Sequence, residues 1–337
     1  MFRGSVRGTA TVVGVLLLVG VVVIVGGVVA LGALTFLDGT GAPQATATFD
    51  YEPTPAGLRM TPNAISTAVT VQLNGRDVAT FEPESAGQSV LLPTAPGDRI
   101  TVVSTDGDRS VLVDRTVEDR SEVGEFIAYY TFDGETGDTT LRDRSGNGNS
   151  GEVKGDPEWN GGSLTFDGNG DYVSVTDLNT SVSDVSAFTI AVTYRTDDGD
   201  RKQELVEHIS GSDNWGMEIK PCRPGCSSTR DTYNPNFFVD EASGSQTGQI
   251  FAGERQTGKR EVLVGTYDRS TGTTGVYIDG KSRATGSFDS EINMGDFFIG
   301  RDAEGGSDFL VGEIYEIRLY YTALDETEVE VLTNAMQ

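Results

Sequence analysis

The hydrophobic positions divide the chain into one long apolar run and a much longer series of short alternating segments. Residues 9–37, TATVVGVLLLVGVVVIVGGVVALGALTFL, contain no charged residue and are flanked by Arg7 and Asp38. As a helix this run would be about 43 Å long at about 1.5 Å per residue. That length exceeds a bilayer hydrocarbon core of about 30 Å. The pattern predicts a single membrane-spanning helix at residues 9–37 after a short basic leader, residues 1–8.

Two arginines in the leader, Arg3 and Arg7, indicate how this helix is oriented. Lys and Arg in short flanking segments stay in the cytoplasm, so the chain from residue 38 onward is expected outside the cell. Gly26 and Ala30 form a small-xxx-small pair, a spacing that lets membrane helices approach closely. The partners expected for the helix are therefore the membrane and other apolar helices packed against it.

Short alternating segments begin after a linker at residues 38–44 and fill residues 45–116. They are separated by turn signals such as Asn74-Gly75, and VTVQLNGRDVATF is typical of a hairpin. Seven strands in about 70 residues predict a small β-sandwich. The expected strands are Thr46–Tyr51, Leu58–Thr61, Ala68–Leu73, Val78–Phe81, Ser89–Leu92, Ile100–Ser104 and Ser110–Asp114.

A second linker, residues 117–124, leads to a larger module at residues 125–337. Its segments alternate as in FTIAVTY and TGVYID, which is typical of strands with one buried face. About a dozen strands are expected, in a two-sheet jelly roll. One short helix is expected near the end, because Asp325 and Glu328 have the spacing of a capping box. The predicted fold class is mainly β: a transmembrane helix, a small sandwich and a jelly roll.

The charge balance is strongly acidic, with 51 acidic and 25 basic residues and a formal net charge of −26. This balance argues against nucleic acid as a partner, because phosphates would be repelled. The acidity has two interpretations, ordinary solubility or adaptation to high salt, where ions screen the repulsion between surface charges. We favour the second, since the acidic residues are spread over the whole polar part.

The two cysteines, Cys222 and Cys226, lie in the segment CRPGC. In an extracellular chain this spacing indicates a tight disulfide loop, with Pro-Gly allowing the turn. Two free thiols are the alternative. A zinc site would need about four ligands, and the chain has a single histidine, His208.

The N-terminal residues RGTATVVGVLLLVGVVVIVGGVVALG resemble the start of haloarchaeal type IV pilins and pilin-like proteins. The resemblance implies cleavage by a prepilin peptidase between Gly8 and Thr9. The uncut helix would hold the subunit in the membrane, and the cut helix could pack into a filament. Ala10-Thr11 departs from the Ser-Pro pair common in the family, and Val13 stands where many bacterial pilins have Glu. A permanently anchored surface protein is the alternative.

The larger module resembles the concanavalin A-like, laminin-G-like jelly-roll family. The motifs that carry the resemblance are FDG after an aromatic strand, DRSGNGN, SLTFDGNGDYVSV, VYIDGK and GEIYEIRLYYTAL. They cover nearly all of residues 126–335, except an insertion or divergent loop at about 210–250. The resemblance implies a sugar-binding or adhesion domain, although the family also includes some glycosidases.

Two oxygen-rich loops are candidate calcium sites, the only cofactor expected. Asp167, Asn169 and Asp171 place oxygen side chains at alternate positions, as calcium loops do. Asp143 and Asn147 lie in a second such loop, DRSGNGN, and the resemblance implies one structural calcium. The alternative is that Asp, Asn and Gly simply form turns here.

Candidate ligand-contacting residues are the aromatic side chains Trp159, Trp215 and Tyr233, because sugars stack on exposed aromatic rings. The alternative places them in the core of the jelly roll. Asn179 lies in the only N-x-S/T sequon and is a predicted glycosylation site on an outward-facing domain.

Catalysis is not expected from the carboxylate pattern. Glycosidases need two positioned carboxylates, and those that this fold family contains typically carry an E-x-D-x-x-E strand, which this chain lacks. Glu313 and Glu316 are three apart, so in a regular strand they would point to opposite faces.

The sequence therefore predicts an outward-facing, membrane-anchored pilin-like surface protein of a halophilic archaeon, with the N-terminus in the cytoplasm. Its jelly roll is expected to mediate adhesion by recognising a glycan or a surface protein. One alternative is a structural subunit of a type IV pilus-like filament. A surface glycoside hydrolase is a second, less favoured alternative.

Overall fold

The computed structural model describes residues 45–105, 109–118, 122–176, 178, 185–209, 213–222, 231–241, 247–305 and 308–337. The predicted membrane helix at residues 9–37, its leader with the Gly8-Thr9 junction, and the linker at 38–44 lie outside these residues. Within the described ranges, no helix is both long and apolar enough to cross a bilayer. The membrane anchor and its processing therefore stay predictions.

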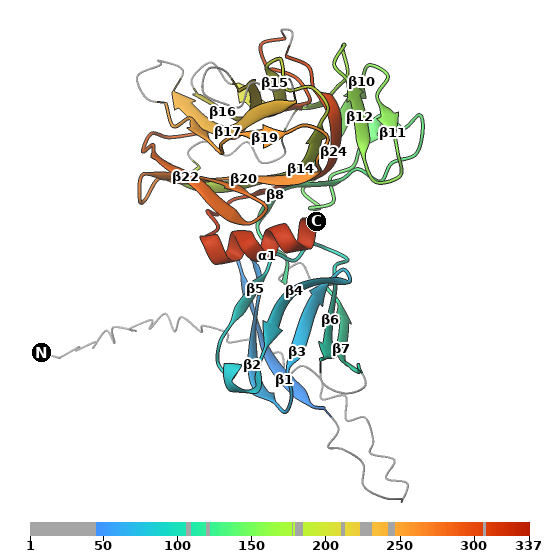
Figure 1. Ribbon diagram of the computed structural model, residues 1–337, viewed down its shortest axis with the longest axis vertical. Coiled ribbons are helices and arrows are strands. Elements are labelled where there is room, and N and C mark those ends of the chain that lie inside the picture. The colour runs from blue at the N-terminus through green and yellow to red at the C-terminus, as the bar shows by residue number, and fades with distance from the viewer. Residues whose placement is uncertain are drawn as a thin grey trace, which may run out of the picture. The chain divides into compact units, whose positions relative to one another are not determined.

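Residues 45–117 form a small sandwich of two sheets, and all seven expected strands are present (Figure 1). Its core contains the fully buried side chains of Leu58, Met60, Val71 and Val102. The three-stranded sheet has the order β1(Ala47–Thr54), β2(Gly57–Ile65), β5(Val90–Leu92), and the four-stranded sheet has the order β4(Arg76–Phe81), β3(Val69–Leu73), β6(Arg99–Ser104), β7(Val111–Thr116). A single 3₁₀ turn, η1(Pro83–Ser85), precedes β5.

The predicted hairpin between β3 and β4 is confirmed by its turn. Asn74 has φ 55° and Gly75 has φ 80°. Positive φ at both central residues defines a type I′ turn, whose twist matches that of the strands it joins. Asn and Gly adopt this conformation at the lowest cost, which explains why this dipeptide predicts the turn.

Residues from Phe126 onward form a large sandwich of two antiparallel sheets, as expected (Figure 1). The nine-stranded sheet comprises, in spatial order, β18(Ile250–Phe251), β17(Thr232–Glu241), β16(Asp213–Pro221), β15(Gln203–Ile209), β23(Phe297–Ile299), β13(Tyr172–Val175), β10(Gly151–Lys154) and β9(Thr140–Leu141), with β19(Arg255–Gln256) paired to β17. The eight-stranded sheet comprises β11(Glu158–Trp159), β12(Leu164–Asp167), β24(Val311–Tyr320), β14(Ala187–Thr196), β20(Glu261–Asp268), β21(Thr273–Ile278) and β22(Lys281–Ser287), with β8(Phe126–Thr131) paired to β24.

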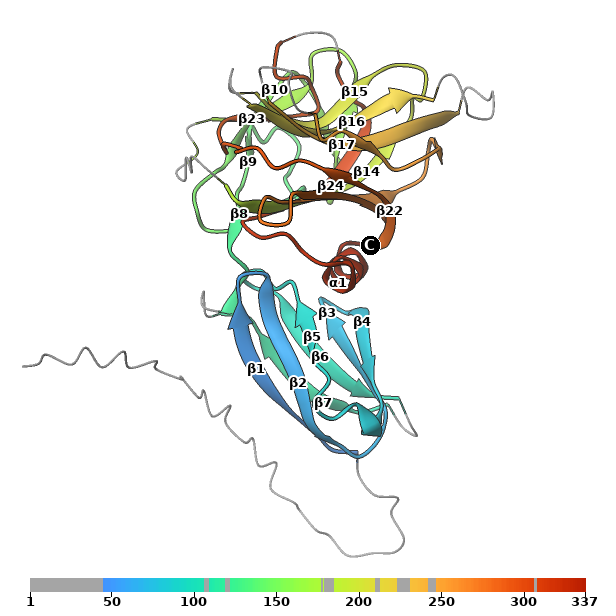
Figure 2. The same cartoon turned by 90° about the vertical axis from the view of Figure 1, so that its left-hand side faces the viewer.

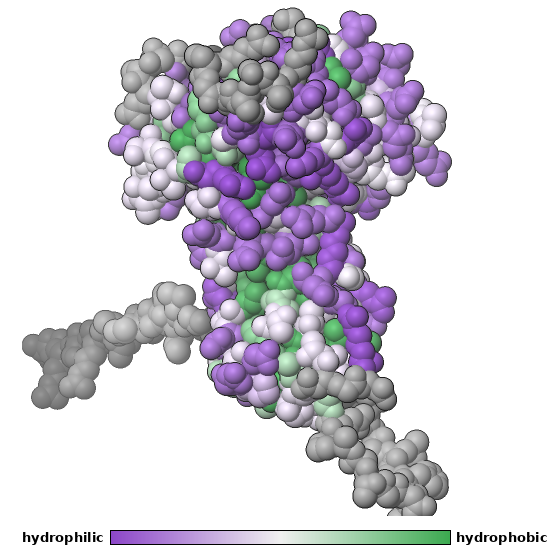
Figure 3. Space-filling view, viewed as in Figure 1, coloured by the Kyte–Doolittle hydropathy of each residue, from purple (hydrophilic) through white to green (hydrophobic). Residues whose placement is uncertain are grey.

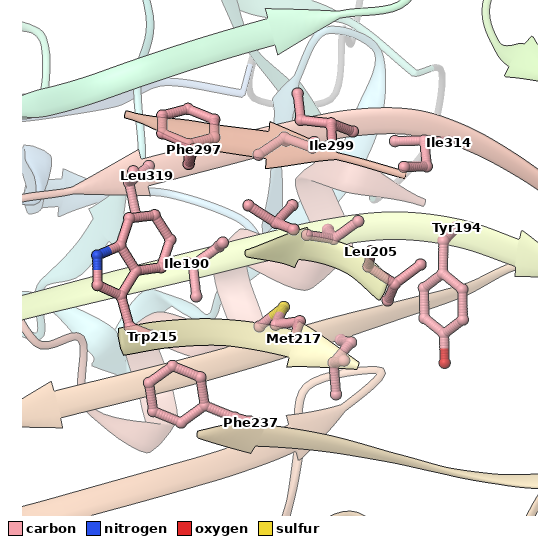
Figure 4. Packing of buried hydrophobic residues seen from close by; sticks show 14 of the residues in the cluster. Ile190, Tyr194, Leu205, Trp215, Met217, Phe237, Phe297, Ile299, Ile314 and Leu319 are labelled. Atoms are coloured by element: carbon pink, nitrogen blue, oxygen red, sulfur yellow. The ribbon is translucent and has the colours of Figure 1, made fainter. Parts of the chain in front are cut away.

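The main core lies between these two sheets. Figure 4 shows Trp215, Met217 and Phe237 of the nine-stranded sheet packed with Ile190 and Leu319 of the eight-stranded sheet. All five side chains are buried. The alternation of apolar and polar residues along each strand therefore sends every second side chain into this layer.

Two β-bulges change which side chains share a face. In β24 the register shifts between Ile314 and Glu316, and Ile314 and Ile317 both lie in the core. Glu313 and Glu316 therefore share the outer face of the eight-stranded sheet, so their expected placement on opposite faces is wrong. The extra residue, Tyr315, is the cause.

A second bulge lies in β15, between Glu204 and Val206. Val206 is paired with Met217 and Ile299 and points into the core. Glu204 and Glu207 consequently both lie on the outer face of the nine-stranded sheet, although three positions separate them.

The predicted C-terminal helix is confirmed as α1(Glu326–Met336). Its capping box is complete: the Glu328 N–H donates to Asp325 Oδ1 and the Asp325 N–H donates to Glu328 Oε2, each at 2.9 Å. Leu332 and Met336 pack on the outer face of the eight-stranded sheet. Val331 belongs to the core of the small sandwich, so α1 joins the two sandwiches (Figure 2).

A buried arginine also links the sandwiches. Arg318, on β24, is 1% exposed. Its Nε lies 2.6 Å from Glu316 Oε1, and its Nη1 donates to the carbonyl of Pro93 in the small sandwich at 2.8 Å. In Figure 2 the layers follow the order nine-stranded sheet, eight-stranded sheet, α1 and small sandwich. The outer face of the nine-stranded sheet therefore lies on the side away from the small sandwich.

Candidate functional site

The three aromatic residues predicted to contact a ligand are structural. Trp215 and Tyr233 are 0% exposed and Trp159 is 8% exposed. Trp215 stacks on His208 at 5.5 Å between ring centroids. The prediction is wrong for a physical reason: these side chains point into the layer between the sheets or are covered, so no ring face is open to a sugar.

The polar atoms of Trp159 and Tyr233 are hydrogen-bonded inside the fold, whereas the buried Trp215 Nε1 has no partner among the described residues. Trp159 Nε1 donates to the Asp138 carbonyl at 3.0 Å. The Tyr233 hydroxyl donates to Glu261 Oε2 at 3.0 Å, and Arg255 Nε lies 2.9 Å from the same carboxylate. Tyr233 and Glu261 are therefore parts of a buried hydrogen-bond network, in which burial raises the Tyr233 pKa far above its ordinary value.

The predicted calcium loop DRSGNGN lies between β9 and β10 and is organised by Asp143. Asp143 Oδ1 accepts hydrogen bonds from the N–H groups of Tyr129 at 3.1 Å and Ser145 at 2.9 Å. Its Oδ2 accepts from the N–H of Asn149 at 2.9 Å. The amide of Asn147 donates to a backbone carbonyl of β8 at 2.6 Å. These contacts are those of turn-forming side chains.

The other predicted calcium loop, with Asp167, Asn169 and Asp171, joins β12 to β13. Asp171 is 2% exposed and accepts hydrogen bonds from the N–H groups of Asp156 at 2.9 Å and Asp167 at 3.1 Å. Asp167 in turn accepts from the N–H of Asn169 at 2.7 Å. Burial raises the pKa of Asp171. Within the described ranges no group of three acidic, His or Cys side chains is placed to hold a metal ion; calcium stays a prediction.

Two further predicted features lie partly or wholly outside the described residues. Cys222, just after β16, is disulfide-bonded, whereas Cys226 is not described. Their pairing therefore stays a prediction. The glycosylation site Asn179 is also outside the described residues.

The outer face of the nine-stranded sheet carries an aromatic and cationic group that sequence reasoning missed. Tyr172 on β13 and Phe298 on β23 are half-buried, and their ring centroids are 6.2 Å apart with an angle of 65°. Arg301 lies over both rings, with Cζ 4.1 Å from each centroid. We call these three residues the Arg301 platform. The alternation in DYVSV and FFIG could have indicated that Tyr172 and Phe298 face outward. The residues beside them, Val173, Val175, Phe297 and Ile299, point inward.

Cross-strand pairing places further side chains beside this platform. Phe298 is opposite Glu207, and Glu207 is opposite Gly216. A side chain at Gly216 would lie 2.8 Å from the ring of Phe238 and 2.5 Å from the Val206 carbonyl. The absence of a side chain there lets the Phe238 ring lie against the sheet.

Three glutamates on this face, Glu204, Glu207 and Glu218, form what we call the carboxylate cluster. The Lys202 ammonium is 2.7 Å from Glu204 Oε1, 3.2 Å from Glu218 Oε2 and 3.1 Å from Asp308 Oδ2. Burial, followed by the charges of Glu207 and Glu218, raises the pKa of Glu204 well above its usual range.

Glu207 is the member of the carboxylate cluster that lies next to the Arg301 platform, opposite Phe298. Burial raises its pKa to about 7. The N–H of Ala303 donates to Glu207 Oε2 at 2.6 Å, which anchors the segment that follows Arg301. Near neutral pH the Glu207 carboxyl can thus act as a hydrogen-bond donor or as an acceptor.

Side-chain amides extend the polar part of this face. Gln249 Nε2 donates to Glu218 Oε1 at 2.6 Å and to Asn236 Oδ1 at 3.1 Å. In the view of Figure 3 hydrophilic residues predominate on the large sandwich. Aromatic rings beside carboxyl and amide groups are the chemistry by which proteins contact saccharides.

A comparison with family models identifies the architecture. Residues 167–330 match the model described as the concanavalin A-like lectin/glucanases superfamily. This segment is a concanavalin A-like jelly-roll domain. The matched residues include Tyr172, Glu207, Phe298 and Arg301, so the concanavalin A-like domain carries the face described above.

Solved structures are similar at low sequence identity. The botulinum neurotoxin type G receptor binding domain is 17% identical with a TM-score of 0.47, covering 62% of this chain and 51% of that chain. Domain 4 of AbnA, an extracellular arabinanase from Geobacillus stearothermophilus in complex with arabinotriose, is 18% identical with a TM-score of 0.46, covering 63% and 98%. The chain covers about half the length of the neurotoxin binding domains. No curated protein matches the chain.

Proposed function

We propose that this protein is an outward-facing, membrane-anchored surface protein whose concanavalin A-like domain binds a glycan. The binding face is the outer face of the nine-stranded sheet. The anchor would be the apolar run at residues 9–37, with Arg3 and Arg7 on the cytoplasmic side. The pilin-type processing after Gly8 belongs to the same proposal and rests on the N-terminal resemblance.

The observation that carries this proposal is the Arg301 platform beside Glu207. The apolar faces of sugar rings stack on aromatic side chains, while their hydroxyl groups bond to carboxyl and amide groups. Tyr172 and Phe298 supply the rings, and Glu207 lies opposite Phe298 on the next strand. The outer face of the other sheet is occupied by α1 and the small sandwich, which leaves the nine-stranded sheet as the binding face.

The small sandwich would act as a spacer between the membrane and this face. The turn after β1 contacts the large sandwich, since the Glu125 N–H donates to the Pro55 carbonyl at 2.6 Å. β1 begins eight residues earlier, at Ala47. At about 3.3 Å per residue this strand separates the entry of the chain from the large sandwich by about 25 Å.

A glycan array with the full chain tests the proposal. The chain would be solubilised in a zwitterionic detergent, because sugar-headed detergents would compete. We expect saccharide binding that Phe298→Ala weakens by about tenfold or more, the loss of one stacked ring being worth ~1–2 kcal/mol. Tyr315→Ala is the control, because Tyr315 is a half-buried ring with Arg260 Cζ 4.2 Å from its centroid, on the other sheet. Equal effects of the two substitutions, or no bound saccharide, would contradict the proposal.

We propose binding without hydrolysis, because the glycosidase strand pattern is absent from the sequence. Reducing sugar released from any polysaccharide would overturn this part. The alternative of a structural filament subunit predicts that the protein is abundant in sheared surface filaments. A sparse or absent protein in that fraction favours the binding protein.

A further inference from the structure

We propose that the Arg301 platform selects acidic glycans, with the Arg301 guanidinium binding a carboxylate or sulfate group of the saccharide. This inference rests on the proposed function and names the class of ligand that the same face would take. It follows from how Arg301 is held in the structure and from the groups that do not pair with it.

Arg301 differs in its surroundings from Arg255 and Arg318, two other partly or fully buried arginines. Arg255 pairs with Glu261 and Arg318 with Glu316, but Arg301 has no acidic group within ion-pair distance among the residues that the structure describes. Its Nε is buried and donates no hydrogen bond to any residue that the structure describes. Aromatic rings, and no described carboxylate, therefore contact the guanidinium of Arg301.

Three carboxyl groups on the neighbouring strands β15 and β10 are engaged elsewhere. Glu207, opposite Phe298, accepts the hydrogen bond from the Ala303 N–H. Glu204 pairs with Lys202, and Glu152 pairs with Lys154 at 2.5 Å. The guanidinium of Arg301 is held instead by the two rings, each 4.1 Å from its Cζ.

This arrangement suits an external anion. The two rings contact the guanidinium without accepting hydrogen bonds from it. The planar fork of its N–H donors matches the two oxygens of a carboxylate or sulfate. The rings also restrict the side chain before binding, so little conformational entropy remains to be lost. A sugar ring on Tyr172 or Phe298 would bring an acidic substituent to these N–H donors.

The test uses saccharide pairs that differ only in charge, with the full chain in zwitterionic detergent. One pair is oligogalacturonate and its methyl ester, and the other is dextran sulfate and dextran. We expect the acidic member of at least one pair to bind about tenfold or more tightly, as for a hydrogen-bonded charge pair. The pair that shows the difference distinguishes carboxylate from sulfate recognition.

Variants separate a specific contact from general charge attraction. Arg301→Gln should abolish the affinity difference of about tenfold or more between the acidic and the neutral member of the pair. Arg99→Gln removes the same charge from an exposed pair with Asp114 in the small sandwich and should change affinity less than twofold. Arg301→Lys keeps the charge without the planar fork and should recover part of the affinity. Urea unfolding midpoints of the variants check that they are folded.

The results that would overturn selection of acidic glycans differ from those that would contradict glycan binding itself. Equal binding of acidic and neutral members would overturn this inference while leaving glycan binding intact. Equal losses in Arg301→Gln and Arg99→Gln, or equal affinities of Arg301→Gln and Arg301→Lys, would also overturn it. A chain that binds no saccharide in either pair and none on the array would contradict the proposed function itself.

Discussion

Replacing Arg318 by methionine should weaken both sandwiches together, because this side chain connects them. Its Nε is paired with Glu316 Oε1 at 2.6 Å and its Nη1 reaches the Pro93 carbonyl of the small sandwich at 2.8 Å. The ring of Tyr129 lies 4.8 Å from the Arg318 Cζ. Arg318→Met keeps most of the volume but leaves a carboxylate and a carbonyl without their donor.

The expected loss in the free energy of unfolding is about 3–5 kcal/mol, the cost of removing one member of a buried ion pair. Arg318 is 1% exposed and the Glu316 side chain is 12% exposed, so water replaces little of the lost contact. The double substitution Arg318→Met with Glu316→Leu removes the stranded charge and should recover most of the loss. Arg195→Met is the control: Arg195 pairs with Glu313 but is 30% exposed, and its loss should cost less than about 1 kcal/mol.

Two probes follow the two sandwiches during urea unfolding. Both tryptophans, Trp159 and Trp215, belong to the large sandwich, so their fluorescence reports that part. Amide hydrogen exchange of β3, residues Val69–Leu73, reports the small sandwich. We expect Arg318→Met to lower the stability seen by both probes equally. A loss below about 1 kcal/mol, or a change confined to the fluorescence, would refute the coupling through Arg318.

Three further predictions address other parts of the molecule. The pKa of Glu207 is raised to about 7 from an ordinary 4.5. Its contribution to stability is therefore fully present below pH 4.5 and is lost, by up to about 3 kcal/mol, as pH rises from 4.5 to 7. Glu207→Gln should flatten this part of a denaturation profile, and an unchanged profile would contradict the assignment. Gly216→Ala places a Cβ 2.5 Å from the Val206 carbonyl. It should lower the free energy of unfolding in urea by about 1–3 kcal/mol. An unchanged free energy of unfolding would show that the Phe238 ring and the strand adjust freely. Mass spectrometry of the membrane fraction should find a chain that starts at Thr9, and only chains that retain Met1 or Phe2 would argue against pilin-type processing.

Local patterns were sufficient for much of the fold. Turn chemistry at Asn74-Gly75 and the capping box at Asp325 and Glu328 each depend on neighbouring residues, and both are observed. Alternation also located the strands, because a half-buried strand needs an apolar residue at every second position. These features involve contacts within a few residues of each other.

The candidate site depends on contacts between distant residues, which local patterns do not specify. β23 lies between β13 and β15, so Tyr172 and Phe298 meet although 126 positions separate them. The bulge in β15 then places Glu207 on the same face. Trp215 and Tyr233 were chosen by residue type, but the phase of their strands points them into the core.

A crystal structure of the full chain with the tightest saccharide from the array would locate the binding site. We expect the sugar to lie over Tyr172 and Phe298, on the outer face of the nine-stranded sheet, with its acidic group at Arg301. A saccharide bound anywhere else on the chain, with this face empty, would contradict this expectation.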